Sequence, residues 1–439
     1  MIICCLITTL PARPQDAPET QSHSLQPISG SRGESAEPLT VSVITCWPGK
    51  EIYELYGHAA IRIRGERFDS VWNYGVFDFR QPNFVYRFVK GETDYMLAGY
   101  PFEWFMPEYV DGGRKVVEQV LNLTPGEAQE LRHILQRESL PQNRQYRYNY
   151  VKDNCATRIL DRIDDASESH AVYPDSVAFG TFRNGMRAYD VNYPWYQFGI
   201  DIALGSGIDR PIGSREEMFI PVEMMQKMER ARFTDGRPLV KETKILYAGR
   251  PGATLDATPW WLTPMTWSLV VLLVSIAIAV YDARRRRVSR WWYTLFFSLL
   301  GIAGCVVTFL VCFSSHEATS PNSLWIWLNP LQLVMAICVW WRLTRPAALA
   351  VAWYNMVVMT VTLIVWPLQN QSANPAFFPL MGSTLILSGA YAIISSGKSY
   401  NNRNEQISHI RADKSGRTKH RDAGAGPRRQ AKARGRNSR

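Results

Sequence analysis

A cysteine and a histidine, far apart in this 439-residue sequence, are the side chains that could together make a nucleophilic site. His58 stands in YGHAAIRIRG, residues 56–65, and Cys155 stands in YVKDNCATRILDRI, residues 150–163. A thiol becomes a strong nucleophile when a neighbouring imidazole takes its proton. Such partners meet only in the fold, so their separation along the chain is no objection.

The motif around Cys155 places this cysteine at the start of a predicted helix, residues 154–166. Asp153 or Asn154 is a good N-cap, and Cys155 then falls in the first helical turn. The N-terminus of a helix carries partial positive charge, which favours a thiolate over a thiol. Its free backbone N–H groups can also receive an oxyanion. On residue type alone, a packing role for this cysteine stays open.

His58 begins one strand of a predicted β-hairpin. The stretches HAAIRIR and RFDSVWNY, residues 58–64 and 67–74, alternate between polar and apolar side chains around a short turn. In the expected register His58 faces Asn73. The side-chain carbonyl of an asparagine can hold one ring N–H of a histidine and so fix the tautomer. An Asn73 that bonds only to a turn backbone is the structural alternative.

The expected register rests on a turn centred on Gly65 and Glu66. With this centre Arg62 faces Asp69, which is a favourable cross-strand ion pair. The opposite face of the hairpin then carries the apolar side chains Ala59, Ile61, Ile63, Phe68 and Trp72. A strand pair that is apolar on one face predicts a core behind it.

The seven cysteines do not suggest a disulfide framework or a metal site. Three lie in apolar runs and two lie at the extreme N-terminus, which leaves Cys46 and Cys155 in the soluble region. A structural disulfide between these two is a rival to a catalytic role for Cys155. No CxxC pair or Cys/His cluster occurs in the sequence, so we expect neither a metal nor a cofactor.

Composition divides the chain into four segments. Residues 1–37 are interpreted as a signal peptide that lacks its basic beginning, followed by a linker. Residues 38–250 predict a globular α+β domain, in which strands and helices are segregated. Residues 258–397 predict a membrane domain, and residues 398–439 form a basic tail that is expected to be disordered.

Two stretches of the globular segment predict regular elements outside the hairpin. VSVITCW, residues 41–47, predicts a strand. TPGEAQELRHILQRESL, residues 124–140, predicts a helix with Thr124 as N-cap, Pro125 at the first position and Glu127 completing a capping box.

Five apolar stretches after Trp260 each have roughly the 20 residues that a bilayer-spanning helix needs: 262–281, 292–313, 324–341, 347–367 and 376–396. Connections that contain arginine alternate along the chain with connections that contain neither Lys nor Arg. The first kind is DARRRRVSR and WRLTRP, and the second kind is SSHEATSPNS and PLQNQSANPA. The positive-inside rule then places the globular domain outside the cytoplasm and the tail inside. A basic tail beside a membrane contacts anionic lipid, so no nucleic-acid partner is predicted.

Six motifs of this sequence together resemble the Bacteroidota family of membrane lipoprotein N-acyltransferases: TCWPG, LYGHAAIRIRG, DSVWNYGVFDF, FVKGETDYML, VLNLTPGE and YRYNYVKDNCATRILDRID. The resemblance is dense from Val41 to Asp165 and continues in the segments DIALGSGID and MFIPVEM. The resemblance also includes the architecture of the transmembrane part. GHAAIR, NYGVFDF and DNCATR are specific in combination, whereas any one of them alone is weak.

This resemblance implies a periplasmic catalytic domain followed by a helical domain in the bacterial inner membrane. The soluble domain is similar to circularly permuted NlpC/papain-like folds, as in lecithin:retinol acyltransferase, in which the histidine strand precedes the cysteine helix. Carried over residue by residue, Cys155 is the expected nucleophile, His58 the base and Asn73 the third, polar residue. Ser70 and Asp78 are the other candidates for the third position.

The activity implied by the resemblance is transfer of an acyl chain from a phospholipid, through a thioester on Cys155, to the α-amine of diacylglyceryl-cysteine in apolipoproteins. The alternative enzyme is a membrane-anchored cysteine amidase or peptidase acting on cell-wall peptides. The third interpretation is a non-catalytic envelope module whose Cys46 and Cys155 form a disulfide.

Two features of the sequence each allow two interpretations. The aromatic segment YPFEWFMPEY, residues 100–109, either shields the site and touches lipid or is an ordinary buried aromatic cluster. Asp201 and Asp209 serve either the site or the fold.

Overall fold

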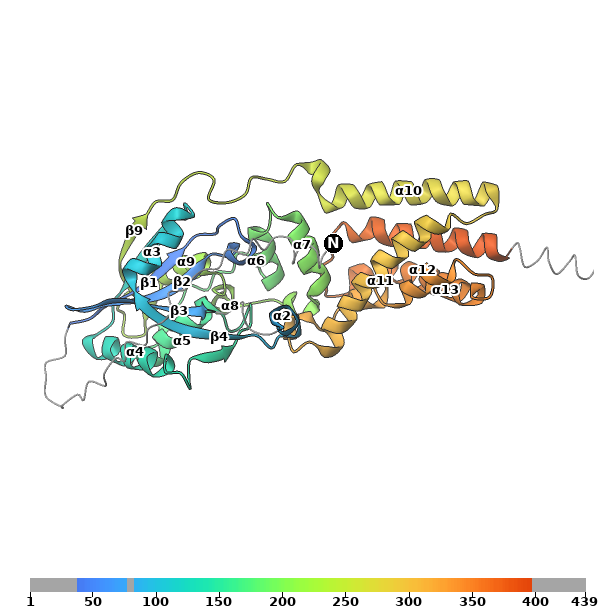
Figure 1. Cartoon of the computed structure of the whole chain (residues 1–439). Coiled ribbons are helices and arrows are strands. Elements are labelled where there is room, and N and C mark those ends of the chain that lie inside the picture. Colours follow the sequence, from blue (N-terminus) through green and yellow to red (C-terminus); the bar gives the residue numbers. More distant parts are fainter. Residues whose placement is uncertain (1–37, 77–82, 397–439) are drawn as a thin grey trace, which may run out of the picture.

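Two parts make up the computed structural model, which describes residues 38–76 and 83–396. A β-sheet with helices packed on it forms one part, and a group of long helices forms the other (Figure 1). The short helices α6 (Phe182–Tyr189) and α7 (Pro194–Ala203) lie between the two parts (Figure 1). The predicted signal-like segment with its linker and the predicted basic tail lie outside the described residues.

A seven-stranded sheet, in which all neighbouring strands are antiparallel, forms the frame of the first part. Its spatial order is β6-β4-β3-β2-β1-β5-β9. Its strands are β1 (Thr40–Cys46), β2 (His58–Arg64), β3 (Asp69–Val76), β4 (Asp94–Pro101), β5 (Val116–Leu121), β6 (Gln145–Arg147) and β9 (Val240–Tyr247). A separate ribbon pairs β7 (Ala171–Val172) with β8 (Arg232–Phe233).

Helices cover both faces of this sheet. Besides α6 and α7, the helical elements of this part are η1 (Ile52–Glu54), α2 (Phe84–Lys90), α3 (Phe102–Asp111), α4 (Pro125–Glu138), α5 (Cys155–Ala166), η2 (Ser206–Ile208), α8 (Ser214–Glu217) and α9 (Pro221–Arg230). Ile61 and Trp72 lie on the face that packs against α4, α5 and α9. Ile44 and Ala60 lie on the opposite face, against Phe105 of α3. The mixed α and β class and the predicted apolar face of the hairpin are therefore confirmed.

Local sequence builds the first turns of α4 and α5 as predicted. Thr124 Oγ1 accepts the N–H of Glu127 at 3.2 Å, while Glu127 Oε2 accepts the N–H of Thr124 at 2.7 Å, which is the expected capping box. At α5 the N-cap is Asn154 rather than Asp153. Strand β1 covers most of the predicted VSVITCW strand.

The register of the β2–β3 hairpin differs from the prediction by two residues. Arg64 pairs with Asp69, and Arg62 pairs with Val71. The loop therefore contains four residues, 65–68, and its centre lies one residue later than the turn that we predicted. The N–H of the first loop residue bonds to the carbonyl of the last at 3.0 Å and closes it.

This shift moves each facing pair but leaves every side chain on its predicted face, because a shift by an even number of residues preserves the alternation of the strand. Arg62 still bonds to Asp69, now diagonally, at 2.7 Å. His58 likewise still reaches Asn73. The predicted pairs do not face each other in the register of the two strands. Their side chains are nevertheless in contact, since Arg62 bonds to Asp69 and His58 bonds to Asn73.

Four helices in the described second part are long and apolar enough to cross a bilayer: α10 (Pro264–Arg285), α11 (Arg290–Phe313), Arg345–Leu368 and Phe377–Ser396. The third of these consists of α13 (Arg345–Val365) and η6 (Trp366–Leu368), which continues it. The third predicted span is instead broken into η5 (Ser323–Ile326) and the short α12 (Leu331–Cys338). Pro330 stands at the break, where its missing N–H and fixed φ stop a continuous helix. The expected count of five continuous membrane helices is therefore not confirmed.

Polar groups beside this break are paired inside the protein. Asn329 Nδ2 donates to the carbonyl of Ile326 and to Tyr354 Oη, both at 3.0 Å. Gln332 Nε2 donates to Asn355 Oδ1 at 2.9 Å. Because a bilayer offers no water to an open helix end, such internal partners let the break lie among the membrane helices.

The connections without Lys or Arg meet the sheet-bearing part, in agreement with the predicted alternation. The N–H of Ser315, after α11, donates to the carbonyl of Lys90 at 2.8 Å. Asn374, between the last two long helices, donates to Asp201 at 3.0 Å. Arg345, in an arginine-bearing connection, bonds to the carbonyl of Ser395 near the far end of the last helix.

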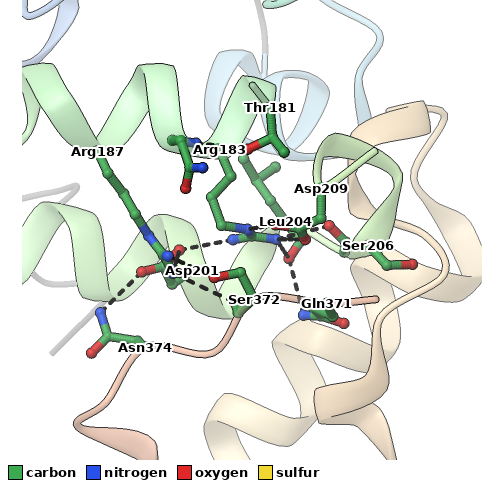
Figure 2. A network of polar contacts seen from close by, with 12 residues as sticks. Thr181, Arg183, Arg187, Asp201, Leu204, Ser206, Asp209, Gln371, Ser372 and Asn374 are labelled. Atoms are coloured by element: carbon green, nitrogen blue, oxygen red, sulfur yellow. Dashed lines mark hydrogen bonds and ion pairs between the residues drawn. The ribbon is translucent and has the colours of Figure 1, made fainter. Parts of the chain in front are cut away.

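A buried ionic network ties the two parts together (Figure 2). Arg183 of α6 is 1% exposed and bonds to Asp201 and Asp209, each at 2.8 Å. Its Nη2 also donates to the carbonyls of Leu204 and Gly205. The two aspartates that the sequence left open therefore belong to the fold.

The second part completes this network (Figure 2). Asp201 accepts bonds from Arg187 and from Asn374 of the membrane-domain connection, both at 3.0 Å. Arg187 in turn donates to Ser372 Oγ at 2.7 Å. Gln371 donates to the carbonyl of Leu204 at 3.3 Å. The position of the sheet relative to the long helices thus depends on bonds between buried polar groups.

Replacing Arg183 by alanine should strongly destabilise the protein. The change leaves Asp201 and Asp209 buried without the cation they share, which costs about 3–5 kcal/mol of the free energy of unfolding. Denaturant unfolding of the full-length protein in detergent measures this loss. Arg210→Ala is the control, because Arg210 pairs with Glu216 at the surface and should cost less than about 1 kcal/mol. Equal losses in the two variants would contradict the role assigned to Arg183.

Candidate active site

Asn154 holds Cys155 in the first turn of α5. Its Oδ1 accepts the N–H groups of Ala156 and Thr157, at 2.9 and 3.0 Å. Its Nδ2 donates to the carbonyls of Tyr150 and Phe219, both at 2.8 Å. One buried amide therefore caps the helix and ties it to two other segments, so the cysteine has a defined position.

The Cys155 sulfur lies against the beginning of the His58 strand. The β2–β3 ladder ends at Ile61 and Trp72, and beyond this point the backbone N–H of Ala59 bonds to the Cys155 sulfur. The N–H groups of Ala156, which bonds to Asn154 Oδ1, and of Cys155 itself lie close enough to the sulfur to lower its pKa. Residues that stand almost a hundred positions apart in the sequence thus meet at one end of the sheet.

Two opposing effects set the protonation of this thiol. Burial raises the pKa of Cys155 to about 11, and the three backbone N–H groups act in the opposite direction. At neutral pH Cys155 is therefore a thiol, and it needs a base to become a nucleophile. The same N–H groups are donors that can stabilise negative charge next to the sulfur.

His58 is held by a chain of two hydrogen bonds. Its Nε2 lies 2.5 Å from Asn73 Oδ1, and Asn73 Nδ2 donates to Tyr100 Oη at 2.8 Å. Because the amide turns its N–H₂ group to Tyr100, its oxygen faces the ring, and His58 Nε2 is the nitrogen that carries the proton. His58 Nδ1 is then the unprotonated nitrogen, which is the form a general base requires.

The surroundings of His58 keep its ring neutral. Burial lowers the pKa of His58 to about 4, the bond to Asn73 acts in the opposite direction, and the Arg114 cation lowers the pKa further. Arg114 is 3% exposed and pairs with Glu54 at 2.9 Å. The site at neutral pH thus combines a neutral thiol with a neutral imidazole.

Cys46 does not pair with Cys155. Both are free thiols, and they belong to opposite faces of the sheet. Cys46 packs with Ile44 and Tyr109 in the cluster under α3, whereas Cys155 packs in the cluster under α5. The predicted rival, a structural disulfide between them, is therefore not formed.

Of the other candidates for the third residue, Ser70 does not reach His58. Ser70 pairs with Ile63, on the face under α5 and at the far end of the strand. Asp78 lies outside the described residues. Asn73 is the predicted polar residue that bonds to His58.

The aromatic segment 100–109 contributes two buried rings to the cluster beside the sheet. Phe105 and Tyr109 of α3 pack against the sheet, and Trp104 is 58% exposed. Tyr100 is the exception, because it bonds to Asn73. Sequence reasoning did not assign Tyr100 to the site, since its place beside Asn73 follows from the pairing of β3 with β4.

Among the described residues, no group of three or more His, Cys, Asp or Glu side chains is arranged to hold a metal ion. The polar groups at this end of the sheet are instead a thiol, an imidazole and an amide. Such a set fits nucleophilic acyl chemistry.

The comparisons with known proteins agree with this layout. Residues 33–184 match the family model described as the Lnb N-terminal periplasmic domain, and residues 256–399 match the model described as the Lnb transmembrane domain. No curated protein and no solved structure matches the chain. The circularly permuted NlpC/papain-like assignment of the sheet domain therefore stays a prediction.

The His58 ring should stay neutral, with its proton on Nε2, down to about pH 4. Nitrogen NMR of histidine-labelled protein reads both the tautomer and the titration, and His58→Gln identifies the signal. Asn73→Ala removes the acceptor and should let the proton exchange between the two nitrogens. A ring that titrates near the ordinary value of 6.5, or that is protonated at Nδ1, would contradict the assigned geometry.

Proposed function

Since the chain belongs to the Lnb family of lipoprotein N-acyltransferases, whose members combine a periplasmic domain with a transmembrane domain, we propose that it transfers an acyl chain from a phospholipid to apolipoproteins. The acceptor is the α-amine of their diacylglyceryl-cysteine. Two observations support the proposal: the Cys155 thiol lies at the backbone N–H of Ala59, the residue that directly follows His58 in β2, and His58 is held by Asn73.

The first half of the reaction makes a thioester. His58 Nδ1 takes the proton of Cys155, and the sulfur attacks the ester carbonyl of the phospholipid. The backbone N–H of Cys155, beside the sulfur, stabilises the oxyanion. The ester C–O bond then breaks, the leaving lysophospholipid oxygen takes the proton from His58, and the acyl group remains on Cys155.

The second half makes an amide. The uncharged α-amine of the acceptor attacks the thioester carbonyl and gives a proton to His58 Nδ1. The C–S bond breaks, and His58 returns the proton to the Cys155 sulfur. Water would compete with the amine for the thioester, so burial of Cys155, which is 7% exposed, favours transfer over hydrolysis.

The arrangement of the two parts supports the substrates proposed. The end of the sheet that begins β2 is joined to α6 by Tyr56, which bonds to Asp190 at 3.1 Å. The network of Arg183 and Asp201 continues from there to the membrane-domain connection. We propose that the site lies in the periplasm, at the surface of the inner membrane where donor and acceptor reside. The basic tail is proposed to lie in the cytoplasm.

Cys155→Ala should abolish the acyl-enzyme. Mass spectrometry of full-length protein incubated with phospholipid vesicles should show an acyl adduct on Cys155 in the wild type and none in this variant. His58→Ala should slow acylation by roughly 10²–10⁴-fold, as the loss of a general base does, and Asn73→Ala should slow it less. In cells, Cys155→Ala should leave lipoprotein N-termini diacylated.

Cys46→Ala is the matched control, since Cys46 is buried on the other face of the sheet and should not change the adduct. Peptide cleavage without any lipid adduct would favour the cysteine amidase alternative over acyl transfer.

The acylation rate should depend on pH through His58. Because the pKa of His58 is lowered to about 4, the ring is a competent base above that pH and loses this role as pH falls through it. The acid limb of single-turnover acylation is therefore expected near pH 4. A limb near 6.5, the ordinary value for histidine, would argue against His58 as the buried base.

A further inference from the structure

A pocket lies at the seam between the sheet-bearing part and the membrane domain. It is bordered by the segment that leads to Cys155, by α6, by η2 with the residues after it, and by η4 (Glu317–Thr319) in the connection after α11. Its volume is about 130 Å³, whereas one water molecule needs only about 10–15 Å³ by the same measure. The pocket therefore has room for a small ligand group.

The lining of this pocket combines apolar and charged side chains. Three members are buried and apolar and three are exposed and charged: Val151, Phe182, Ile208, Lys152, Arg210 and Glu317. Ligand pockets use such a mixture, in which apolar walls bury the ligand and a few polar groups fix its orientation. A phosphate diester has the same mixed character, because its charged phosphate stands between CH₂ groups.

The charged side chains are held only by exposed ion pairs. Lys152 Nζ bonds to Glu317 Oε2 across the seam, and these side chains are 53% and 65% exposed. Arg210 Nη1 donates to Glu216 Oε2 of α8 at 3.0 Å, also at the surface. Exposed ion pairs contribute little to stability, so a ligand that brings matching charges can replace them.

The balance of charge indicates which ligand matches. Lys152 and Arg210 are positive, whereas Glu216 and Glu317 are negative, so the four side chains sum to zero. A ligand with one negative and one positive group finds a partner for each. A phosphate diester without a positive group would bring its charge to two carboxylates and offer them no counter-charge, which disfavours it.

The pocket lies at the level of phospholipid headgroups. Helix α11 has 24 residues and is about 36 Å long, which exceeds the roughly 30 Å of the hydrocarbon core. Glu317 follows the end of this helix by four residues. In the same connection, His316 Nε2 bonds to the carbonyl of Phe88 of α2 at 2.9 Å. The connection is thus held between the sheet-bearing part and the end of a membrane helix, where headgroups lie.

The charged lining is also close to the nucleophile along the chain. Lys152 precedes Cys155 by three residues, so their Cα atoms are at most about 11 Å apart. The turn that bears Lys152 is closed by two backbone bonds between Asn149 and Asp153, both at 3.0 Å. In a phospholipid only the few bonds of the glycerol separate the phosphate from the ester carbonyls. A phosphate held at Lys152 therefore limits the distance between the ester and the Cys155 sulfur.

We propose that this pocket binds the headgroup of the acyl donor and selects a phospholipid whose phosphate is followed by an amine, as in phosphatidylethanolamine. Lys152 and Arg210 bind the phosphate, and Glu317 binds the ammonium group. The inference rests on the proposed function, and it adds the class of phospholipid that serves as donor.

Donor kinetics of the full-length protein test this selection. The probes are phosphatidylethanolamine and phosphatidylglycerol with the same acyl chains, each presented in micelles of a neutral maltoside detergent. The mole fraction of lipid that gives half-maximal acylation of Cys155 should be about three- to five-fold lower for phosphatidylethanolamine, as expected for one exposed charge pair. Equal values for the two lipids would overturn the proposal.

Two variants separate ligand binding from a structural role of the Lys152–Glu317 pair. Lys152→Ala should raise the half-saturating mole fraction about three- to five-fold for both lipids, because it removes a partner of the phosphate. Glu317→Gln should raise it by this factor for phosphatidylethanolamine alone, because it removes the partner of the ammonium group. The maximal rate should stay unchanged in both variants. Two variants that behave alike with both lipids would mean that the pair only ties the two parts together, and would overturn the proposal.

The ion pair of Lys244 with Glu242 on β9 supplies matched controls, because it is similarly exposed and does not line the pocket. Lys244→Ala and Glu242→Gln change the charge of the protein in the same way as the two test variants. Both should leave the half-saturating mole fraction unchanged for either lipid.

Soluble competitors identify the group that is bound. Glycerophosphoethanolamine has the headgroup but no acyl chains, and it should inhibit acylation competitively. Inorganic phosphate should inhibit less, because it lacks the ammonium group. Equal inhibition by the two compounds would indicate a plain anion site and would overturn the proposed selection.

The outcomes separate this inference from the function on which it rests. A wild-type protein that forms no acyl-enzyme with either lipid would overturn the proposed function itself. An acyl-enzyme that forms in Lys152→Ala and Glu317→Gln with the half-saturating mole fractions of the wild type would overturn the headgroup site alone.

Discussion

The buried amide of Asn154 is the interaction on which the site depends. It caps α5 and at the same time bonds to the carbonyls of Tyr150 and Phe219. A capping side chain normally accepts hydrogen bonds only from the free backbone N–H groups of its own helix. Here it also fixes that helix against two other segments, and so it brings the Cys155 sulfur to the N–H of Ala59. Every chemical property inferred for the thiol follows from that placement.

The electrostatics of the site follow from burial more than from charge. Burial raises the pKa of Cys155 and lowers the pKa of His58, so each group is driven to its neutral form. The nearby Arg114 reinforces this for the imidazole. A neutral pair suits a site at a lipid surface, because a charged pair would require solvation that membrane-adjacent protein supplies poorly.

The junction between the two parts holds the site in the position that the proposed chemistry requires. A lipid ester and a lipid-anchored amine both lie at the membrane surface, so the thiol must be held there at a fixed height. The ionic network centred on Arg183 and Asp201 and the contacts of His316 with Phe88 supply this constraint from two sides. Buried ion pairs are rarely a source of large net stability, but they define one geometry and penalise others.

Local signals in the sequence were sufficient for some features. The capping box at Thr124 and the helix start at Asn154 depend on neighbours within a few residues, and both were predicted. The faces of the β2–β3 hairpin were also predicted, because alternation along a strand is a local property. Its register was not, since a four-residue loop with a different centre preserves the same alternation.

By itself the sequence determined the residue types of the site and the alternation of charge along the membrane segments, because both are properties of short stretches. It also predicted the contact of His58 with Asn73, although through the wrong register. Only the tertiary structure decided that Tyr100 orients Asn73, that Asp201 and Asp209 serve a network around Arg183, and that the third membrane segment is broken at Pro330. Each of these depends on which distant segments pack together, and that is settled by the free energy of the whole fold rather than by any local pattern.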